Sequence, residues 1–173
     1  MSETRRFVIR RAFVVPLGLL LVLVGLLLGV SIAHGQPVAK LIFLLVFAVP
    51  VGVMFSASLF RHIDIDPAGV TAVRLGRSRR IDFSRVTALE TVQVRSRVFL
   101  TLVAGDDEFL IISNGYADFP ELVRSLVAAL PESVLPEETR RLAEAPPRRH
   151  ADVAMAWFAV AALVYVLIAQ FQG

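Results

Sequence analysis

The sequence predicts a membrane protein with three transmembrane α-helices and one α+β domain, in which antiparallel strands are followed by a helix. Three observations support this fold class. Apolar residues make up 56% of the 173 residues, above the roughly 45–50% of soluble domains. They gather in three long runs, at 12–33, 38–60 and 153–171. Between the last two runs, apolar and polar residues first alternate and then repeat at helical spacing, which indicates strands and then a helix.

Each apolar run is long enough to cross a bilayer, which takes about 20 residues in a helix. Segment 12–33 carries no charge, and segment 38–60 carries only Lys40 near its start, where a long side chain reaches the headgroups. Residues 12–60 therefore predict a transmembrane hairpin, and 153–171 predicts a third span. A signal peptide cleaved after "SIA" is the weaker interpretation of the first run, because a signal core has only about 7–15 apolar residues.

Basic residues set the predicted orientation. Segment 1–11 is a basic tail with four arginines, Arg5, Arg6, Arg10 and Arg11. Arg148 and Arg149 precede the third run, whereas the connector between the first two runs leads only to Lys40. Cytoplasmic loops are enriched in arginine and lysine. We therefore expect a multi-pass protein of the bacterial inner membrane, with 1–11 and 61–152 in the cytoplasm and Gly173 on the periplasmic or extracellular side.

Small residues recur at steps of four or seven along the first two runs. They are Gly18, Gly25, Gly29 and Ala33 in the first run, and Ala48, Gly52 and Ser56 in the second. Such spacing lets membrane helices approach closely, because packing replaces the hydrophobic driving force that lipid does not supply. A hairpin folded near Gln36 places Gly25 level with Ala48. We expect these residues to be helix-packing contacts, although glycine is also common in membrane helices generally.

The segment after the second run changes to strand patterns. The stretches "HIDID", "VTAVRL" and "RVFLTLVA" are extended, and the turn sequences "DPAG", "GRSR" and "GDDE" separate strands. This predicts about six short antiparallel strands. In "ADFPELVRSLVAAL", apolar residues then follow helical spacing, with Asp118 and Glu121 as an expected capping box. Residues 132–152 are expected to be a linker that contains a short helix.

The order of these motifs resembles the PH-like domains of bacterial membrane proteins, in which the domain often follows a two-helix hairpin. The resemblance covers roughly residues 38–131. It rests on "IDIDPAGV", "RRIDFSRVTAL", the "GDDE" turn and "YADFPELVRSLVAAL". The third run is a departure from the simplest two-helix members. The resemblance implies a PH-like antiparallel β-sandwich or barrel over 61–131, capped by a C-terminal helix, and a binding or scaffolding role rather than an enzymatic one.

Five arginines crowd one predicted hairpin over residues 74–85. They are Arg74, Arg77, Arg79, Arg80 and Arg85. Eukaryotic PH domains bind phosphorylated lipid headgroups through basic residues on early strand loops, so these arginines are the candidate lipid-binding residues. Anionic lipid would contribute about 1 kcal/mol per basic residue near the surface. The alternative is a solvated turn, since the chain from Arg61 onward has 13 arginines and 14 acidic residues.

Several function classes lack the residues that they require. The chain has no cysteine, which excludes disulfides and thiolate catalysis. Its sequence contains no phosphate-binding loop, nucleophile elbow or zinc-protease motif. Asp64 and Asp66 are interpreted as the polar face of a strand rather than a metal pair. We therefore expect no enzyme activity, no metal site and no cofactor, and the near-neutral charge of 61–152 argues against a nucleic-acid partner.

The sequence thus favours a non-enzymatic accessory or scaffold protein whose cytoplasmic domain binds a membrane or cytoplasmic protein. One alternative is a module that senses anionic lipid through the arginines of 74–85. Another is a subunit or assembly factor of a larger membrane complex or transporter. The expected partners are the lipid bilayer, a protein and a second copy of the chain as a homo-oligomer.

Overall fold

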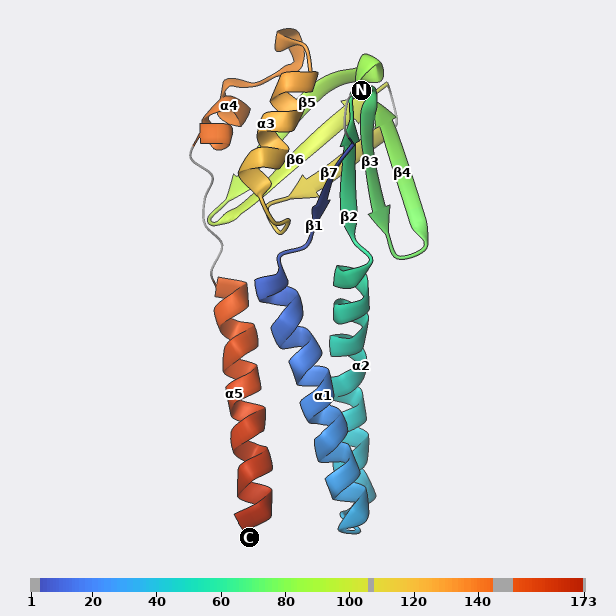
Figure 1. Cartoon of the computed structure of the whole chain (residues 1–173), viewed down its shortest axis with the longest axis vertical. Helices are drawn as coiled ribbons and strands as arrows, with labels where there is room; N and C mark the ends of the chain where they lie inside the picture. The colour runs from blue at the N-terminus through green and yellow to red at the C-terminus, as the bar shows by residue number, and fades with distance from the viewer. Residues whose placement is uncertain (1–3, 106–107, 145–150, 173) are drawn as a thin grey trace. The chain divides into compact units, whose positions relative to one another are not determined.

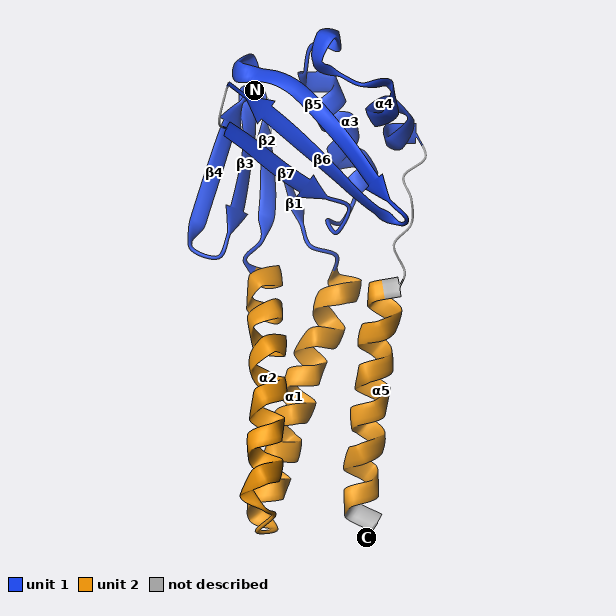
Figure 2. Cartoon of the chain, turned by 180° about the vertical axis from the view of Figure 1, so that it is seen from behind, with its two compact units in different colours: residues 1–10, 60–149 blue, residues 11–59, 150–173 orange. Residues whose placement is uncertain are grey.

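The computed structural model describes residues 4–105, 108–144 and 151–172, and for residues 151, 171 and 172 it describes the backbone alone. The chain divides into two compact units (Figure 2). Unit 1 comprises residues 1–10 and 60–149, and unit 2 comprises residues 11–59 and 150–173. Unit 1 is built on β-sheets and unit 2 is helical, so the first unit is called the sheet unit below.

Unit 2 consists of three helices, α1 (Arg11–Ala33), α2 (Val38–Leu59) and α5 (Ala151–Gln172). All three are long and apolar enough to cross a membrane, which confirms the prediction of three long apolar helices. Helix α1 packs against both α2 and α5. Its buried residues Leu17, Leu20 and Leu23 form a cluster with Val160 of α5. The third helix therefore completes the packing of α1.

The sheet unit contains two antiparallel sheets (Figure 1). The four-stranded sheet has the order β1-β2-β3-β4, with bounds Arg5–Val8, His62–Asp66, Gly69–Arg74 and Arg77–Asp82. The three-stranded sheet has the order β5-β6-β7, with bounds Val86–Val94, Arg97–Ala104 and Glu108–Ser113. A 3-10 turn at Phe83–Arg85 connects the two sheets. Antiparallel strands were predicted, and this part of the prediction is confirmed.

The first strand corrects the expected tail at 1–11. Residues Arg5–Val8 form β1, which pairs with β2 from Arg5 opposite Ile65 to Val8 opposite His62. The sheet unit therefore has seven strands among its described residues, one more than predicted. The strand has only four residues, and Phe7 is the one that is buried. Such a short segment shows too little alternation of apolar and polar residues to predict a strand from the sequence. The partner strand lies more than fifty residues further along the chain, and only the tertiary fold brings the two together.

Helix α3 (Phe119–Ala129) follows the strands and turns Phe119, Leu122 and Leu126 into the core. The expected capping box is wrong. Asp118 has a positive φ of 51° and makes no side-chain cap, and its backbone carbonyl accepts the N–H groups of Glu121 and Leu122 instead. A residue whose side chain caps a helix typically has φ and ψ in the β region, and Asp118 does not.

The segment 132–152, expected to be a linker with a short helix, does contain a short helix. It contains a 3-10 turn at Glu132–Val134 and helix α4 (Glu137–Glu144). Leu142 of α4 belongs to the core of the sheet unit, and the buried hydroxyl of Thr139 bonds that of Thr91 on β5 at 2.8 Å. Helix α4 is therefore a docked element of the sheet unit. The rest of the expected linker includes residues 145–150, which lie outside the described residues.

Candidate functional site

The five arginines of 74–85 do not form one site, because the register of β3 and β4 separates them. Arg74 pairs with Arg77 at the turn, whereas Gly69 pairs with Asp82 at the opposite end. Near that opposite end, Arg80 contacts Asp66 at 2.5 Å and Asp82 at 3.0 Å. Hydrogen bonds from Arg80 lower the pKa of Asp66 to about 2, and this partnership in turn raises the pKa of Arg80. Arg80 is therefore neutralised within its own sheet.

The other arginines have different surroundings. Arg85 forms an ion pair with Glu108 at 3.0 Å. The guanidinium of Arg79 lies over the ring of Phe109 on β7, 5.5 Å from its centre, and Arg74 donates a hydrogen bond to the carbonyl of Ile111 at 3.3 Å. Among the described residues, neither these two arginines nor Arg77 has a carboxylate partner. The turn end of the hairpin thus keeps its positive charge.

The β3–β4 turn lies at a specific end of the four-stranded sheet. Val73 of β3 pairs with His62, which in turn pairs with Val8, so all three lie at one end. The chain continues from this end into α1 and α2, since Val8 precedes Arg11 by three residues and His62 follows Leu59 by three. Leu75 in the turn is 56% exposed. An exposed leucine between two arginines therefore lies at the end of the sheet that is joined to both helices.

The outer face of the four-stranded sheet is polar and charge-paired. Arg6, Asp64, Thr71 and Arg80 lie in one cross-strand row. Arg6 makes two hydrogen bonds to the carboxylate of Asp64, at 2.8 and 3.0 Å, and this contact raises the pKa of Arg6. His62 lies 3.7 Å from the same carboxylate. The charges of this row are paired and the row contains no large apolar residue. Burying it against a partner would therefore gain little hydrophobic free energy.

The outer face of the three-stranded sheet is apolar instead. Side chains alternate across a strand, so residues beside the buried Leu100, Leu110 and Ile112 point outward. The register aligns Val92 with Phe99, Thr101 with Ile111, and Val103 with Phe109. The outer sheet face, as this surface is called below, carries six apolar residues, Val92, Val94, Phe99, Val103, Phe109 and Ile111. The same register also places Glu90 and Thr101 on it, between the rows of Val92 and Val103. Val92, Val94, Phe109 and Ile111 are between 39% and 56% exposed.

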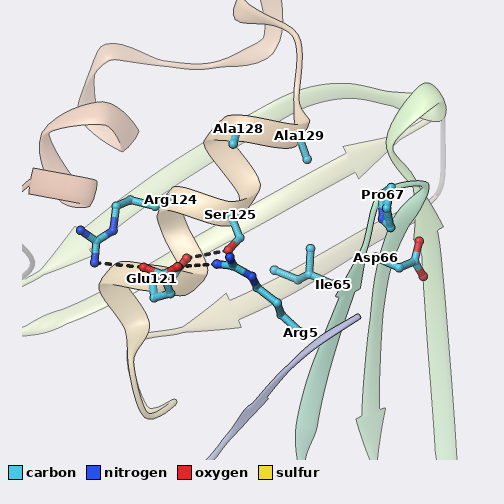
Figure 3. Close-up of a pocket in the computed structure, with 9 residues that line it drawn as sticks. All are labelled: Arg5, Ile65, Asp66, Pro67, Glu121, Arg124, Ser125, Ala128 and Ala129. Carbon is cyan, nitrogen blue, oxygen red and sulfur yellow. Dashed lines mark hydrogen bonds and ion pairs between the residues drawn. The ribbon is translucent and has the colours of Figure 1, made fainter. Parts of the chain in front are cut away.

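A third feature is a groove of about 690 Å³ between β1, the end of β2 and α3 (Figure 3). One ion pair crosses it, from Arg5 on β1 to Glu121 on α3, and Glu121 also contacts Arg124 of its own helix at 3.2 Å. Ser125 and two alanines of α3 form its helical wall. Since charges of both signs are already paired across this groove, its electrostatics select no ligand.

Tyr116 organises the segments that lead into the helices, and the sequence analysis missed it. The ring is almost completely buried. Its hydroxyl accepts a hydrogen bond from Arg61 at 2.9 Å, and the Arg61 guanidinium lies 5.5 Å from the ring centre. Arg10 donates to the Tyr116 carbonyl at 3.2 Å. Residues 10 and 61, which flank the hairpin 12–60, therefore share one partner. No local pattern around "NGY" indicates such a role.

The structure separates the predicted helix-packing residues into two groups. A Cβ added to Gly18 would lie 3.0 Å from the ring of Phe55, and one on Gly52 would lie 3.7 Å from Leu21. Ala48 and Ser56 are partly buried on α2. Gly25 and Gly29 have open space where a Cβ would be, and Ala33 is exposed. The buried stripe of α1 includes Leu20, Val24 and Leu27, so large apolar residues as well as small ones make the packed surface of this helix.

Among the described residues, no group of three or more histidine or acidic side chains is arranged to hold a metal ion. A scan against protein-family models finds no match, and searches of curated proteins and of solved structures find none either. The geometry therefore defines the class: a chain with three helices able to span a membrane and a two-sheet unit with one polar and one apolar outer face.

Proposed function

We propose that this chain is a non-enzymatic accessory or scaffold protein of the bacterial inner membrane, whose cytoplasmic PH-like domain binds a protein partner. Antiparallel sheets of four and three strands followed by α3 support the PH-like assignment. Three long apolar helices support a multi-pass membrane protein. A subunit or assembly factor of a larger membrane complex is one form that such a scaffold takes.

The pairing of β1 with β2 supports the proposed topology. These strands share one folded unit although α1 and α2 lie between them in sequence. Strands that hydrogen-bond to each other lie on the same side of a membrane, so the chain between them crosses an even number of times. Two spans satisfy this condition. The arginines of segment 1–10 then favour the cytoplasmic side for the sheet unit.

The outer sheet face is the observation that carries the proposed protein binding. A largely apolar exposed surface of this kind is typical of interaction sites. The four-stranded sheet provides an internal comparison, because its outer face carries the Arg6–Asp64 and Arg80–Asp66 ion pairs. Antiparallel sheets that face water on one side carry polar residues there. Because the outer face of the four-stranded sheet is polar and that of the three-stranded sheet is largely apolar, we expect a bound partner to cover the latter.

Affinity purification of the tagged full-length chain in mild detergent tests this proposal. We expect a co-purifying protein that is lost when Val92 and Ile111 are both changed to glutamine. The control is Ser78→Gln, an exposed position on β4 of the polar sheet, which should retain the partner. Recovery of a lone monomer, or equal recovery of the partner by both variants, would count against binding through the outer sheet face.

A second candidate function is contact with anionic lipid through the β3–β4 turn. Leu75 is exposed between Arg74 and Arg77, at the end of the sheet that continues into α1 and α2. A basic turn with a protruding apolar side chain suits the headgroup layer, where each arginine contributes about 1 kcal/mol. The candidate lipid-binding residues are thereby reduced from five arginines to two.

Because the chain lacks cysteine, an environment-sensitive fluorophore on Leu75→Cys reports this contact specifically. In nanodiscs, the emission should shift to the blue with anionic lipid relative to neutral lipid. The shift should disappear when Arg74 and Arg77 are changed to alanine, and also at high salt. Arg124→Ala, on the exposed side of α3, is the matched control. Identical emission in both lipids would rule the contact out.

A further inference from the structure

We infer that the outer sheet face binds an amphipathic helix that carries acidic residues beside its apolar stripe. This inference rests on the proposed protein-binding function and names the chemistry of the partner. Three features carry it: the width of the face, the positive charges at its margins, and the shape of its side chains.

The width of the outer sheet face matches one helix. Neighbouring strands lie about 4.8 Å apart, so β5, β6 and β7 present a surface roughly 10 Å across. A helix with its side chains is about 10–12 Å in diameter. The paired rows Val92–Phe99 and Val103–Phe109 supply apolar contacts on adjacent strands. A helix with an apolar stripe on one side covers such a surface in a single layer.

The margins of the face carry positive charge. The guanidinium of Arg79 lies over the ring of Phe109, and Arg74 is hydrogen-bonded to the backbone of β7, so both guanidiniums are held beside the apolar residues. Arg95 lies in the β5–β6 turn with a φ of 55°, at the end of the strand that carries Val94. None of these three arginines has a carboxylate partner among the described residues. Glu90 on β5 offsets only part of this charge.

These charges argue against a second copy of the chain as the occupant. Two identical faces would bring Arg74 and Arg79 of one copy near the arginines of the other, and unpaired like charges at an interface are destabilising. Carboxylates beside the stripe of a partner helix would instead find guanidiniums already oriented, which favours charge-assisted hydrogen bonds.

The shape of the face argues against a bilayer as the occupant. The valine and isoleucine side chains of β5 and β7 are short, and the guanidinium of Arg79 lies over the larger ring of Phe109, so this face has little apolar side chain that protrudes into a headgroup layer. Leu75, which is exposed in the β3–β4 turn, is by contrast a side chain that can protrude into a headgroup layer. A sheet face that carries β-branched and aromatic residues packs well against a rigid helix, as sheet faces do inside domains.

The test uses two synthetic helical peptides with the same leucine stripe, one flanked by glutamates and the other by lysines. Each is labelled and titrated with full-length protein in nanodiscs of zwitterionic lipid, with empty nanodiscs as the blank, and binding is followed by fluorescence anisotropy. We expect the glutamate peptide to bind at least about tenfold more tightly than the lysine peptide. This preference should shrink as salt screens the charges.

Two variants locate the binding. The double variant Val92→Gln/Ile111→Gln should bind the glutamate peptide about tenfold or more weakly than the parent, because apolar contact is lost. Arg74→Ala with Arg79→Ala should reduce its affinity to that of the lysine peptide. Ser78→Gln on the polar sheet should change neither. All these positions except Arg79, which stacks on Phe109, lack packing in the core, and thermal unfolding shows whether each variant remains folded.

Three outcomes would overturn the inference. Equal affinity for the two peptides would remove the acidic requirement, and unchanged binding by the Val92/Ile111 variant would place the peptide elsewhere. Self-association, or protection of a Val92→Cys label by anionic lipid, would assign the face to another occupant. A different result is that the Val92/Ile111 variant loses a native partner in the purification while neither peptide binds the parent protein. In that case the proposed protein binding stands, and the inference of an acidic amphipathic helix is rejected.

Discussion

At the scale of residues, an arginine presents a net positive charge only where no neighbouring carboxylate neutralises it. Arg80 lies between the carboxylates of Asp66 and Asp82, whereas Arg77 has no carboxylate partner among the described residues. Asp66 also closes the turn after β2, since its carboxylate accepts the N–H groups of Ala68 and Gly69 at 2.9 Å. The carboxylate of one side chain thus supports both a turn and an ion pair.

Replacing Asp66 by asparagine tests this ion pair. The amide oxygen keeps the turn hydrogen bonds but loses the charge, so we expect the free energy of unfolding to fall by about 0.5–1 kcal/mol at pH 6. The pKa of Asp66 in the folded protein is about 2, below its ordinary value of 3.8. The stabilisation is therefore complete above about pH 4 and is lost as the pH falls through about 2.

The measurement is urea unfolding of the full chain in detergent, followed by a fluorophore on Glu90→Cys in the three-stranded sheet. The difference between the Asp66→Asn variant and the parent should disappear toward pH 2. Asp118→Asn is the control, because Asp118 has no ion-pair partner among the described residues, and its effect should not vary with pH. A constant difference for Asp66→Asn across this range would contradict the assignment.

At the scale of elements, helix packing in unit 2 is decided by large residues as much as by small ones. Leu17, Leu20, Leu23 and Val160 form the cluster between α1 and α5. Gly18 allows close approach of the Phe55 ring on α2, while Gly25 has open space beside it. Glycines that look equivalent in sequence therefore have different roles.

Leucine substitutions distinguish the two glycines. Gly18→Leu should overpack the contact with Phe55 and lower stability by about 1–3 kcal/mol. Gly25→Leu should be neutral or slightly stabilising, because the position is open and leucine favours helix more than glycine does. Thermal unfolding in detergent, monitored by Trp157, the single tryptophan of the chain, makes the comparison. Equal destabilisation by the two substitutions would show that Gly25 is also a packed position.

Helix α4 is a short element that depends on its contacts with the rest of the sheet unit. It has eight residues, too few to be stable alone, so Leu142 and the Thr139–Thr91 hydrogen bond hold it on the sheet unit. Leu142→Ala should raise amide hydrogen exchange across 137–144 by about tenfold or more while α3 remains protected. Arg141→Ala, at an exposed position of the same helix, should leave exchange unchanged. Protection of α4 in the leucine variant would mean that other contacts suffice.

At the scale of the whole molecule, the proposed topology follows from the pairing of β1 with β2. These strands belong to one sheet although α1 and α2 lie between them in the sequence. Single cysteines test this topology, since the chain has no cysteine of its own. In intact cells, Thr4→Cys and Glu90→Cys should resist a membrane-impermeant thiol reagent, and Gln36→Cys should react. All three should react once the membrane is permeabilised. Labelling of Glu90→Cys in intact cells would place the sheet unit outside and remove the basis for contact with the cytoplasmic leaflet.

The amino-acid sequence alone determined the three long helices and the succession of strands and helix, because these depend on local composition and periodicity. It also identified five arginines near one hairpin. Only the tertiary structure decided that Arg80 is neutralised, while Arg77 has no carboxylate partner within the described part of the chain. Ion pairs form between strands whose register no local pattern reveals.

The same reason explains the features that sequence patterns missed. Strand β1, the contacts of Tyr116 and the docking of α4 all join segments distant in sequence. The outer sheet face likewise consists of residues from three strands, each of which shows only ordinary alternation. Periodicity shows that a strand has two faces, but long-range pairing decides which residues share a face and whether anything covers it.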